Sequence, residues 1–124
     1  MSRTIITTPK APKAPPSYSQ AVQAVGLIFV SGTAPIDPAT GKIVEGSIEV
    51  QVAQCLRNIS AILEAAGSCL QKAVSATLII ADEDDFAAAN EEWLNVVSDR
   101  SAGATGCQAA RPHSGAEGLD RDDR

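Results

Sequence analysis

The sequence of 124 residues contains no continuous apolar run of roughly 20 residues, the length that a membrane-spanning helix needs. Its N-terminal stretch, MSRTIITTPKAPKAPP, also has no apolar core of the kind found in secretory signal peptides. We therefore expect no membrane partner and a cytoplasmic location. Arg3, Lys10 and Lys13 leave a mitochondrial targeting role open, although the prolines between them disfavour an amphipathic helix.

The sequence also lacks an excess of basic residues. Ten Lys and Arg face 15 Asp and Glu, which gives a formal net charge of -5. Since nucleic-acid binding depends on neutralising phosphates with cations, the charge gives no support for a nucleic-acid partner.

Metal-binding patterns are missing as well. Cys55, Cys69 and Cys107 have no CxxC spacing, and His113 is the single histidine, so no zinc ligand set is expected. Cys55 falls on the apolar stripe of a predicted helix, where a small buried thiol is the simplest interpretation.

Three extended runs occupy the first third of the chain. Arg3 to Thr8 is β-branched and leads into a proline-rich connector that favours extended backbone. Ser17 to Val22 and Gly26 to Ser31 are a hairpin apart, and the second is apolar enough for a central strand. Ala34 to Gly46 carries the Asp, Pro and Gly residues of a surface loop.

A helical pattern follows from Ser47, a plausible N-cap, to Gly67, a C-terminal stop, with apolar residues at helical spacing between them. Ala73 to Ala81 predicts a buried strand. Acidic residues from Asp82 then offer caps for a second helix that reaches about Leu94.

This order predicts one α+β domain with a mixed sheet. A right-handed crossover through the first helix to a parallel strand places both helices on one face of the sheet. The other face is left bare and apolar, and such a face usually requires a partner. We therefore expect a homo-oligomer.

Several motifs together resemble the RidA (YjgF, L-PSP endoribonuclease-like) family. The resemblance covers about residues 5–94, which we take as one domain, residues 1–94, followed by an atypical tail of low expected order, residues 95–124. The matching motifs are Tyr18-Ser19-Gln20-Ala21, Phe29-Val30-Ser31-Gly32, Asp37-Pro38, Thr40-Gly41, Asn58, Ile62-Leu63, Ala65-Ala66-Gly67, Asp85-Phe86, Asn90 and Trp93.

The resemblance implies a chorismate-mutase-like subunit that forms a homotrimer with ligand sites in the clefts between subunits. Family members hydrolyse 2-aminoacrylate-type enamines or imines to 2-keto acids and ammonia, without a metal or organic cofactor. The partners expected are therefore further copies of the chain and small imino or keto acids. Tyr18, Ser31 and Gly32 are the candidate substrate-binding residues, and each also has a structural interpretation: a cap on the core, a strand end and a turn.

The family holds the substrate carboxylate with an arginine in a Pro-Ala-Arg stretch, and an acid on the last strand positions water. The slot of the arginine is Ala104 here, and the slot of the acid is Arg121. Weak or absent imine hydrolysis is therefore expected. The alternative function is a catalytically silent protein for small-molecule binding or assembly, and an endoribonuclease ranks third.

Residues 95–124 lack an alternating strand pattern and are rich in Ala, Gly, Ser, Asp and Arg. Back-translated and read one base later, Ser101 to Ala104 can encode Pro-Pro-Ala-Arg, and Gly118 to Asp123 can encode Val-Ser-Ile-Glu-Thr-Ile. We therefore hypothesise a frameshifted or mis-spliced tail, with natural divergence as the alternative. The coding-strand sequence past Leu94 distinguishes the two.

Overall fold

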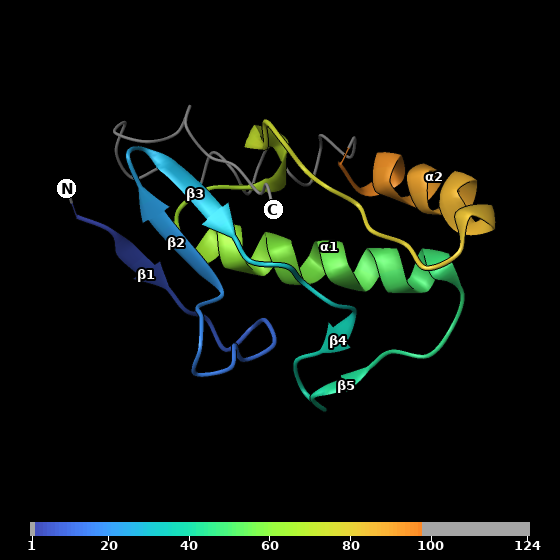
Figure 1. The fold of residues 1–124 in the computed structure, drawn as a ribbon, viewed down its shortest axis with the longest axis horizontal. Helices are drawn as coiled ribbons and strands as arrows, with labels where there is room; N and C mark the ends of the chain where they lie inside the picture. Colours follow the sequence, from blue (N-terminus) through green and yellow to red (C-terminus); the bar gives the residue numbers. More distant parts are fainter. Residues whose placement is uncertain (1, 98–124) are drawn as a thin grey trace.

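The computed structural model describes residues 2–97. Strands β1 (Thr4–Ile6), β2 (Ala21–Ala24) and β3 (Leu27–Val30) form an antiparallel sheet in the order β1-β2-β3. Helix α1 (Ile48–Ala65) packs against this sheet, and α2 (Phe86–Val97) packs against α1 (Figure 1). The α+β class is therefore confirmed.

A tight turn at Val25 and Gly26 joins β2 to β3. Both residues have positive φ, 49° and 79°, which is the conformation of the type I′ turn that suits the twist of a hairpin. Val25 is β-branched and rarely adopts this conformation, so the turn carries backbone strain at that residue. The predicted hairpin is confirmed, but β2 is the middle strand and β3 lies at the edge of the described sheet, whereas the sequence favoured β3 as central.

Helix α1 begins and ends where the sequence predicted. The Ser47 hydroxyl accepts a hydrogen bond from the backbone of Val50 at 3.4 Å, and Gly67 takes a φ of 87° just beyond the last turn. One face of the helix is buried against the sheet and α2, and its buried apolar residues are Val52, Leu56, Ile59, Ile62 and Leu63.

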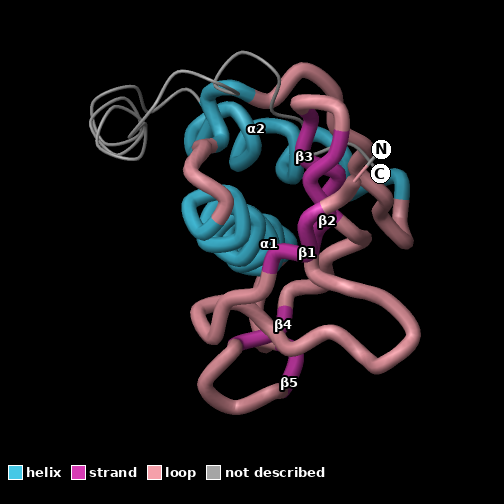
Figure 2. The backbone as a smooth tube through the Cα atoms, turned by 90° about the vertical axis from the view of Figure 1, so that its left-hand side faces the viewer, coloured by secondary structure: helices cyan, strands magenta, loops and turns pink. Residues whose placement is uncertain are grey.

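Helix α2 is preceded by a 3₁₀ turn, Glu83–Asp85, where the Asp82 carboxylate accepts a hydrogen bond from the backbone of Asp84 at 2.9 Å. The helix runs past Leu94 to Val97. Only Ala89 of α2 is buried, and Trp93 and Val96 pack partly against the core. Both helices lie on the same side of the three-stranded sheet, as predicted (Figure 2).

The two faces of the sheet differ in what covers them. Ile6, Ala21 and Val30 pair across the three strands and are all buried toward α1. The adjacent row of Ile5, Val22 and Phe29 points to the other face, where Ile5 is 56% and Phe29 is 39% exposed. An apolar row on an uncovered face is therefore present, as the sequence analysis expected.

The predicted surface loop contains a small hairpin of β4 (Ile36–Asp37) and β5 (Lys42–Ile43). The Asp37 carboxylate accepts a hydrogen bond from the backbone of Ala39 at 2.8 Å, and Gly41 takes a φ of 74°. This turn projects below the sheet in Figure 2. Among the described residues, no helix combines the length and apolar character needed to cross a membrane.

The prediction of a buried strand from Ala73 to Ala81 is wrong. A 3₁₀ turn, Leu70–Lys72, precedes the segment, which has no strand partner among residues 2–97 and is largely exposed. The expected parallel strand is therefore absent from the described sheet. An apolar β-branched run favours extended backbone, but a strand also requires a neighbour whose backbone it can pair with.

Candidate functional site

The predicted binding residues Ser31 and Gly32 follow the end of β3, next to the segment that leads into β2. The backbone N–H of Ser31 donates to the carbonyl of Gln20 at 3.0 Å, and the Ser31 hydroxyl donates to the carbonyl of Ser19 at 2.6 Å. Tyr18 directly precedes this junction and is 53% exposed, and Gly32 follows it with open space around its Cα. The structure thus brings the segments of Tyr18, Ser31 and Gly32 together at one end of the sheet.

The proline-rich connector is fixed by one buried side chain, Gln20. Its amide oxygen accepts from the backbone N–H of Thr8 at 2.7 Å, and its amide nitrogen donates to the carbonyls of Thr8, Ala11 and Pro12 at 3.0, 3.3 and 2.8 Å. A connector with few internal hydrogen bonds is thereby tied to the sheet. Gln20 was not singled out from the sequence, because its signal lies in tertiary contacts.

A second buried amide, Asn58, fixes the loop after Gly32. Its nitrogen donates to the carbonyls of Ala34 at 3.2 Å and Ile36 at 2.8 Å, and its oxygen accepts from Gln54 at 2.9 Å. The side chain is 1% exposed. Asn58 therefore holds the chain that leaves Gly32 against α1, which makes it a positioning residue for this end of the site.

A cavity of about 470 Å³ lies beside this loop. Gly32 to Pro35 form one wall, α1 forms the floor, and residues 77–81 with Asp85 and Trp93 form the opposite side. Its lining is mostly apolar with a few polar groups, a composition typical of small-molecule sites. Gly32 lines this cavity, whereas Tyr18 and Ser31 do not.

Cys55 is the one thiol on the cavity wall, and it donates to the carbonyl of Thr33 at 3.4 Å. Burial raises the pKa of the Cys55 thiol above its ordinary value. Since the thiolate is the reactive form, Cys55 is a poor nucleophile at neutral pH and serves mainly in packing.

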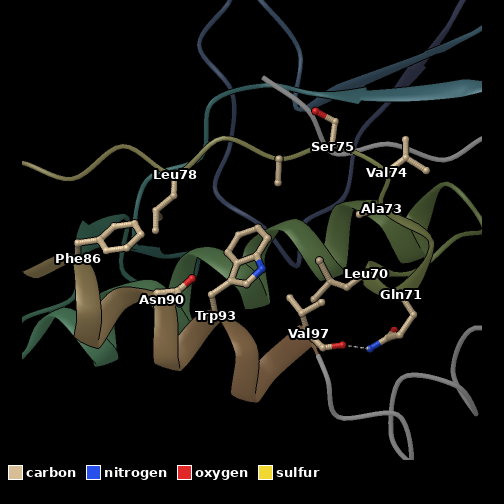
Figure 3. A pocket seen from close by; sticks show the side chains of 11 residues that line it. Leu70, Gln71, Ala73, Val74, Ser75, Leu78, Phe86, Asn90, Trp93 and Val97 are labelled. Atoms are coloured by element: carbon tan, nitrogen blue, oxygen red, sulfur yellow. Dashed lines mark hydrogen bonds between the residues drawn. The ribbon is translucent and has the colours of Figure 1, made fainter.

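A second cavity, of about 420 Å³, separates α2 from the extended segment above it (Figure 3). Phe86, Asn90 and Trp93 line it from α2, and Leu78 points toward them from the segment. These three residues belong to the family motifs identified in the sequence. Here Phe86 is 57% exposed, so its ring is only partly packed.

The two slots that carry the predicted chemistry, Ala104 and Arg121, lie outside the described residues. So do all but the first three residues of the predicted tail, residues 95–124, to which the frameshift hypothesis applies. Within residues 2–97, no group of three or more His, Cys, Asp or Glu residues could hold a metal ion. The described part of the site is thus a set of hydroxyl, amide and backbone groups beside apolar surface.

Comparison with known proteins places the chain in a family. The family model described as endoribonuclease L-PSP matches residues 8–117, which runs past Leu94. A RutC family protein of Pyrococcus abyssi is 46% identical over 93 residues, covering 75% of this chain and 73% of that protein. The 2-iminobutanoate/2-iminopropanoate deaminase of Capra hircus is 45% identical over 91 residues, covering 73% and 66%.

A solved structure gives the same result for the fold. The crystal structure of Escherichia coli TdcF with bound serine superposes with a TM-score of 0.74 at 29% identity, covering 98% of this chain and 84% of that one. The resemblance inferred from the sequence motifs is therefore confirmed, and the chain belongs to the endoribonuclease L-PSP family, which includes the RutC and RidA proteins.

Proposed function

We propose that this chain is a subunit of an imine and enamine deaminase, which converts 2-imino acids to 2-keto acids and ammonia. The observation that carries the proposal is its 45% identity to a 2-iminobutanoate/2-iminopropanoate deaminase. The hydroxyl and backbone groups around Ser31 and Gly32 supply hydrogen-bonding groups at one end of the sheet. The relative named above with bound serine, a small amino acid, supports a ligand of similar size.

The reaction needs a held carboxylate and a positioned water. The water oxygen adds to the imine carbon while one of its protons moves to nitrogen, which gives a carbinolamine. The hydroxyl proton then also moves to nitrogen as the carbon–nitrogen bond breaks, which releases ammonia and the keto acid. Tyr18 would form one wall of the site, and Ser31 and Gly32 would contact the substrate through a hydroxyl and through close backbone approach. Asn58 would act indirectly by holding the loop that follows Gly32.

We further propose that the site lies between copies of the chain in a homotrimer. Ile5, Val22 and Phe29 form an apolar row across the open sheet face, and an exposed apolar patch of this kind favours association. Burying this row between copies would bring Tyr18, at the end of the same sheet, close to a neighbouring subunit. A charge substitution at the centre of the row, Val22→Lys, should dissociate the trimer.

The proposed activity is reduced in this chain because the arginine slot is Ala104 and the acid slot is Arg121. Without a cation for the carboxylate and an acid for the water, the rate should fall by about 10² or more relative to an intact deaminase. Binding without turnover is the alternative function, and the same two substitutions favour it.

The decisive assay generates 2-iminopropanoate in place from alanine with an amino-acid oxidase and measures the release of ammonia. A small acceleration over buffer is expected from the chain, with a larger one from a matched protein whose residues after Leu94 come from the alternative reading frame. If neither protein accelerates hydrolysis, the deaminase proposal is wrong. A rise in Tm with pyruvate but no turnover would favour the binding function, whereas RNA cleavage would favour the endoribonuclease.

A further inference from the structure

The segment from Ala73 to Ala81 begins with an extended residue, is followed by another, and has no strand partner among residues 2–97. Ala73 has φ and ψ of −64° and 138°, and Asp82, just beyond it, has −125° and 121°. The N–H of Ala73 bonds to Leu70 at 3.0 Å, but from Val74 to Ala81 no backbone group bonds to another backbone group of the described chain. The segment therefore forms no strand ladder with the described residues.

Large apolar side chains of the segment face solvent. Val74 is 62%, Leu78 is 39% and Ile79 is 85% exposed. Cavities of about 420 and 470 Å³ adjoin the segment, the first toward α2 (Figure 3) and the second toward the loop after Gly32. Ile80 packs partly against the core, whereas Val74, Leu78 and Ile79 remain exposed.

Residues 73–81 also lack every feature that normally protects an exposed strand from pairing. The run AVSATLIIA contains no charged residue, no proline and no glycine. Charged side chains and proline are the usual means by which proteins stop an edge strand from recruiting another chain. An uncharged, β-branched, exposed run is thus suited to take a further strand.

The charges that flank the run determine which strand fits. Lys72 precedes it, and the acidic residues Asp82 to Asp85 follow it. If two copies paired parallel and in register, each acidic group would lie against its own copy. If they paired antiparallel, Lys72 of each copy would lie against the acidic group of the other, which is favourable.

We propose that residues 73–81 form an antiparallel strand pair with the same segment of a second copy of this chain. The two-fold axis passes through Thr77, so that Lys72 lies opposite Asp82 of the partner. The remaining direct pairs are Ala73 with Ala81, Val74 with Ile80, Ser75 with Ile79 and Ala76 with Leu78, and Thr77 lies opposite its own copy. The interface is self-complementary and closes after two copies.

The state of Lys72 supports an anionic partner. Its ammonium group is buried and makes no hydrogen bond with the described residues. A buried cation without a partner is costly, and a nearby carboxylate removes that cost. The flexible stem of lysine allows the ammonium group to turn toward Asp82 of a second copy.

This surface is separate from the open sheet face that carries Ile5, Val22 and Phe29. The face row points out of the sheet, whereas the segment, yellow in Figure 1, runs across α1 to the start of α2. Both contacts can therefore form in one assembly. A protein that uses both should sediment at twice the size that it reaches through the sheet face alone.

The first test is Ile79→Lys, measured by sedimentation velocity over a range of concentrations. The substitution should weaken this association roughly tenfold or more, because each copy would bring a lysine into the interface, opposite Ser75 of the other copy. Val50→Lys is the matched control: Val50 is also exposed, at 43%, but lies on α1 and lines neither of the cavities that adjoin the segment. Equal association of the wild type and Ile79→Lys would overturn the proposal.

The second test reverses the charge pair. Lys72→Glu and Asp82→Lys should each weaken association, and the double variant should restore it toward the wild-type value. Asp82→Asn is the control, because it keeps a side-chain oxygen for the Asp84 N–H and removes only the charge. Failure of the double variant to restore association would contradict the antiparallel arrangement. Slow amide exchange at residues 74–81 in a protein that never doubles in size would mean that residues 98–124 cover the segment, and would also contradict it.

Discussion

Two apolar β-type runs of this chain have opposite fates. Leu27–Val30 is a strand, paired with β2 and packed on α1 through Ile28 and Val30, whereas residues 73–81 are extended but pair with nothing among the described residues. Their amino-acid composition is alike. The difference shows that local preference selects extended backbone, while a tight turn to a neighbouring strand decides whether a ladder forms.

The largest expected effect comes from substituting one isoleucine in each of the two runs and comparing the free energies of unfolding. Ile28→Ala should lower the free energy of unfolding by about 2–5 kcal/mol, because Ile28 is 1% exposed and its removal leaves a cavity. Ile79→Ala should change it by only about 0.5 kcal/mol or less, because Ile79 is 85% exposed. Urea denaturation at low protein concentration measures both. Equal losses would mean that the segment is packed like β3.

The next test concerns the buried amide that holds the loop between β3 and α1. Asn58→Ala removes hydrogen bonds to Ala34, Ile36 and Gln54 and should cost about 2–3 kcal/mol, because the partners lose their bonds in a buried site. Asn90→Ala, at an exposed position of α2, should cost about 0.5 kcal/mol or less. Thermal unfolding followed by circular dichroism compares the two. A loss at Asn58 no greater than that at Asn90 would contradict its positioning role.

The smallest expected effect lies in the turn that gives β3 its partner. Val25→Asn should stabilise the protein by about 1 kcal/mol, since asparagine adopts positive φ more readily and Asn-Gly favours the type I′ turn. Val25 is 57% exposed, so little packing is lost. Chemical denaturation measures the gain. Val44→Asn, the same substitution at a residue outside the turn, is the control. If Val44→Asn stabilised the protein by the same amount, relief of strain in the turn would not be the cause.

Helix α1 could be predicted from the sequence because its signals are local. Apolar residues recur at helical spacing between a serine that caps the start of the helix and a glycine that ends it. In the structure Ser47 caps the start and Gly67 lies just beyond the end. The hydrogen bonds of Gln20 could not be predicted, because each joins Gln20 to a residue that lies 8 to 12 positions earlier in an irregular connector. The motif containing Gln20 was recognised, but its structural role was not.

The candidate site divides in the same way. Motifs in the sequence identified Tyr18, Ser31 and Gly32, and the hydrogen bonds of Ser31 explain why two of these segments meet. The cavity beside Gly32 was not anticipated, since it depends on where residues 77–81 lie relative to α1. Only three-dimensional packing can bring such distant walls together.

The sequence by itself determined the helices, the hairpin, the apolar character of both sheet faces and the family, because these follow from side-chain periodicity, capping residues and short motifs. The tertiary structure alone decided that β2 is the middle strand of the described sheet and that residues 73–81 pair with no strand among residues 2–97. The physical reason is that a strand completes its hydrogen bonds with a neighbour that is distant in sequence, and no local pattern specifies whether that neighbour is in place.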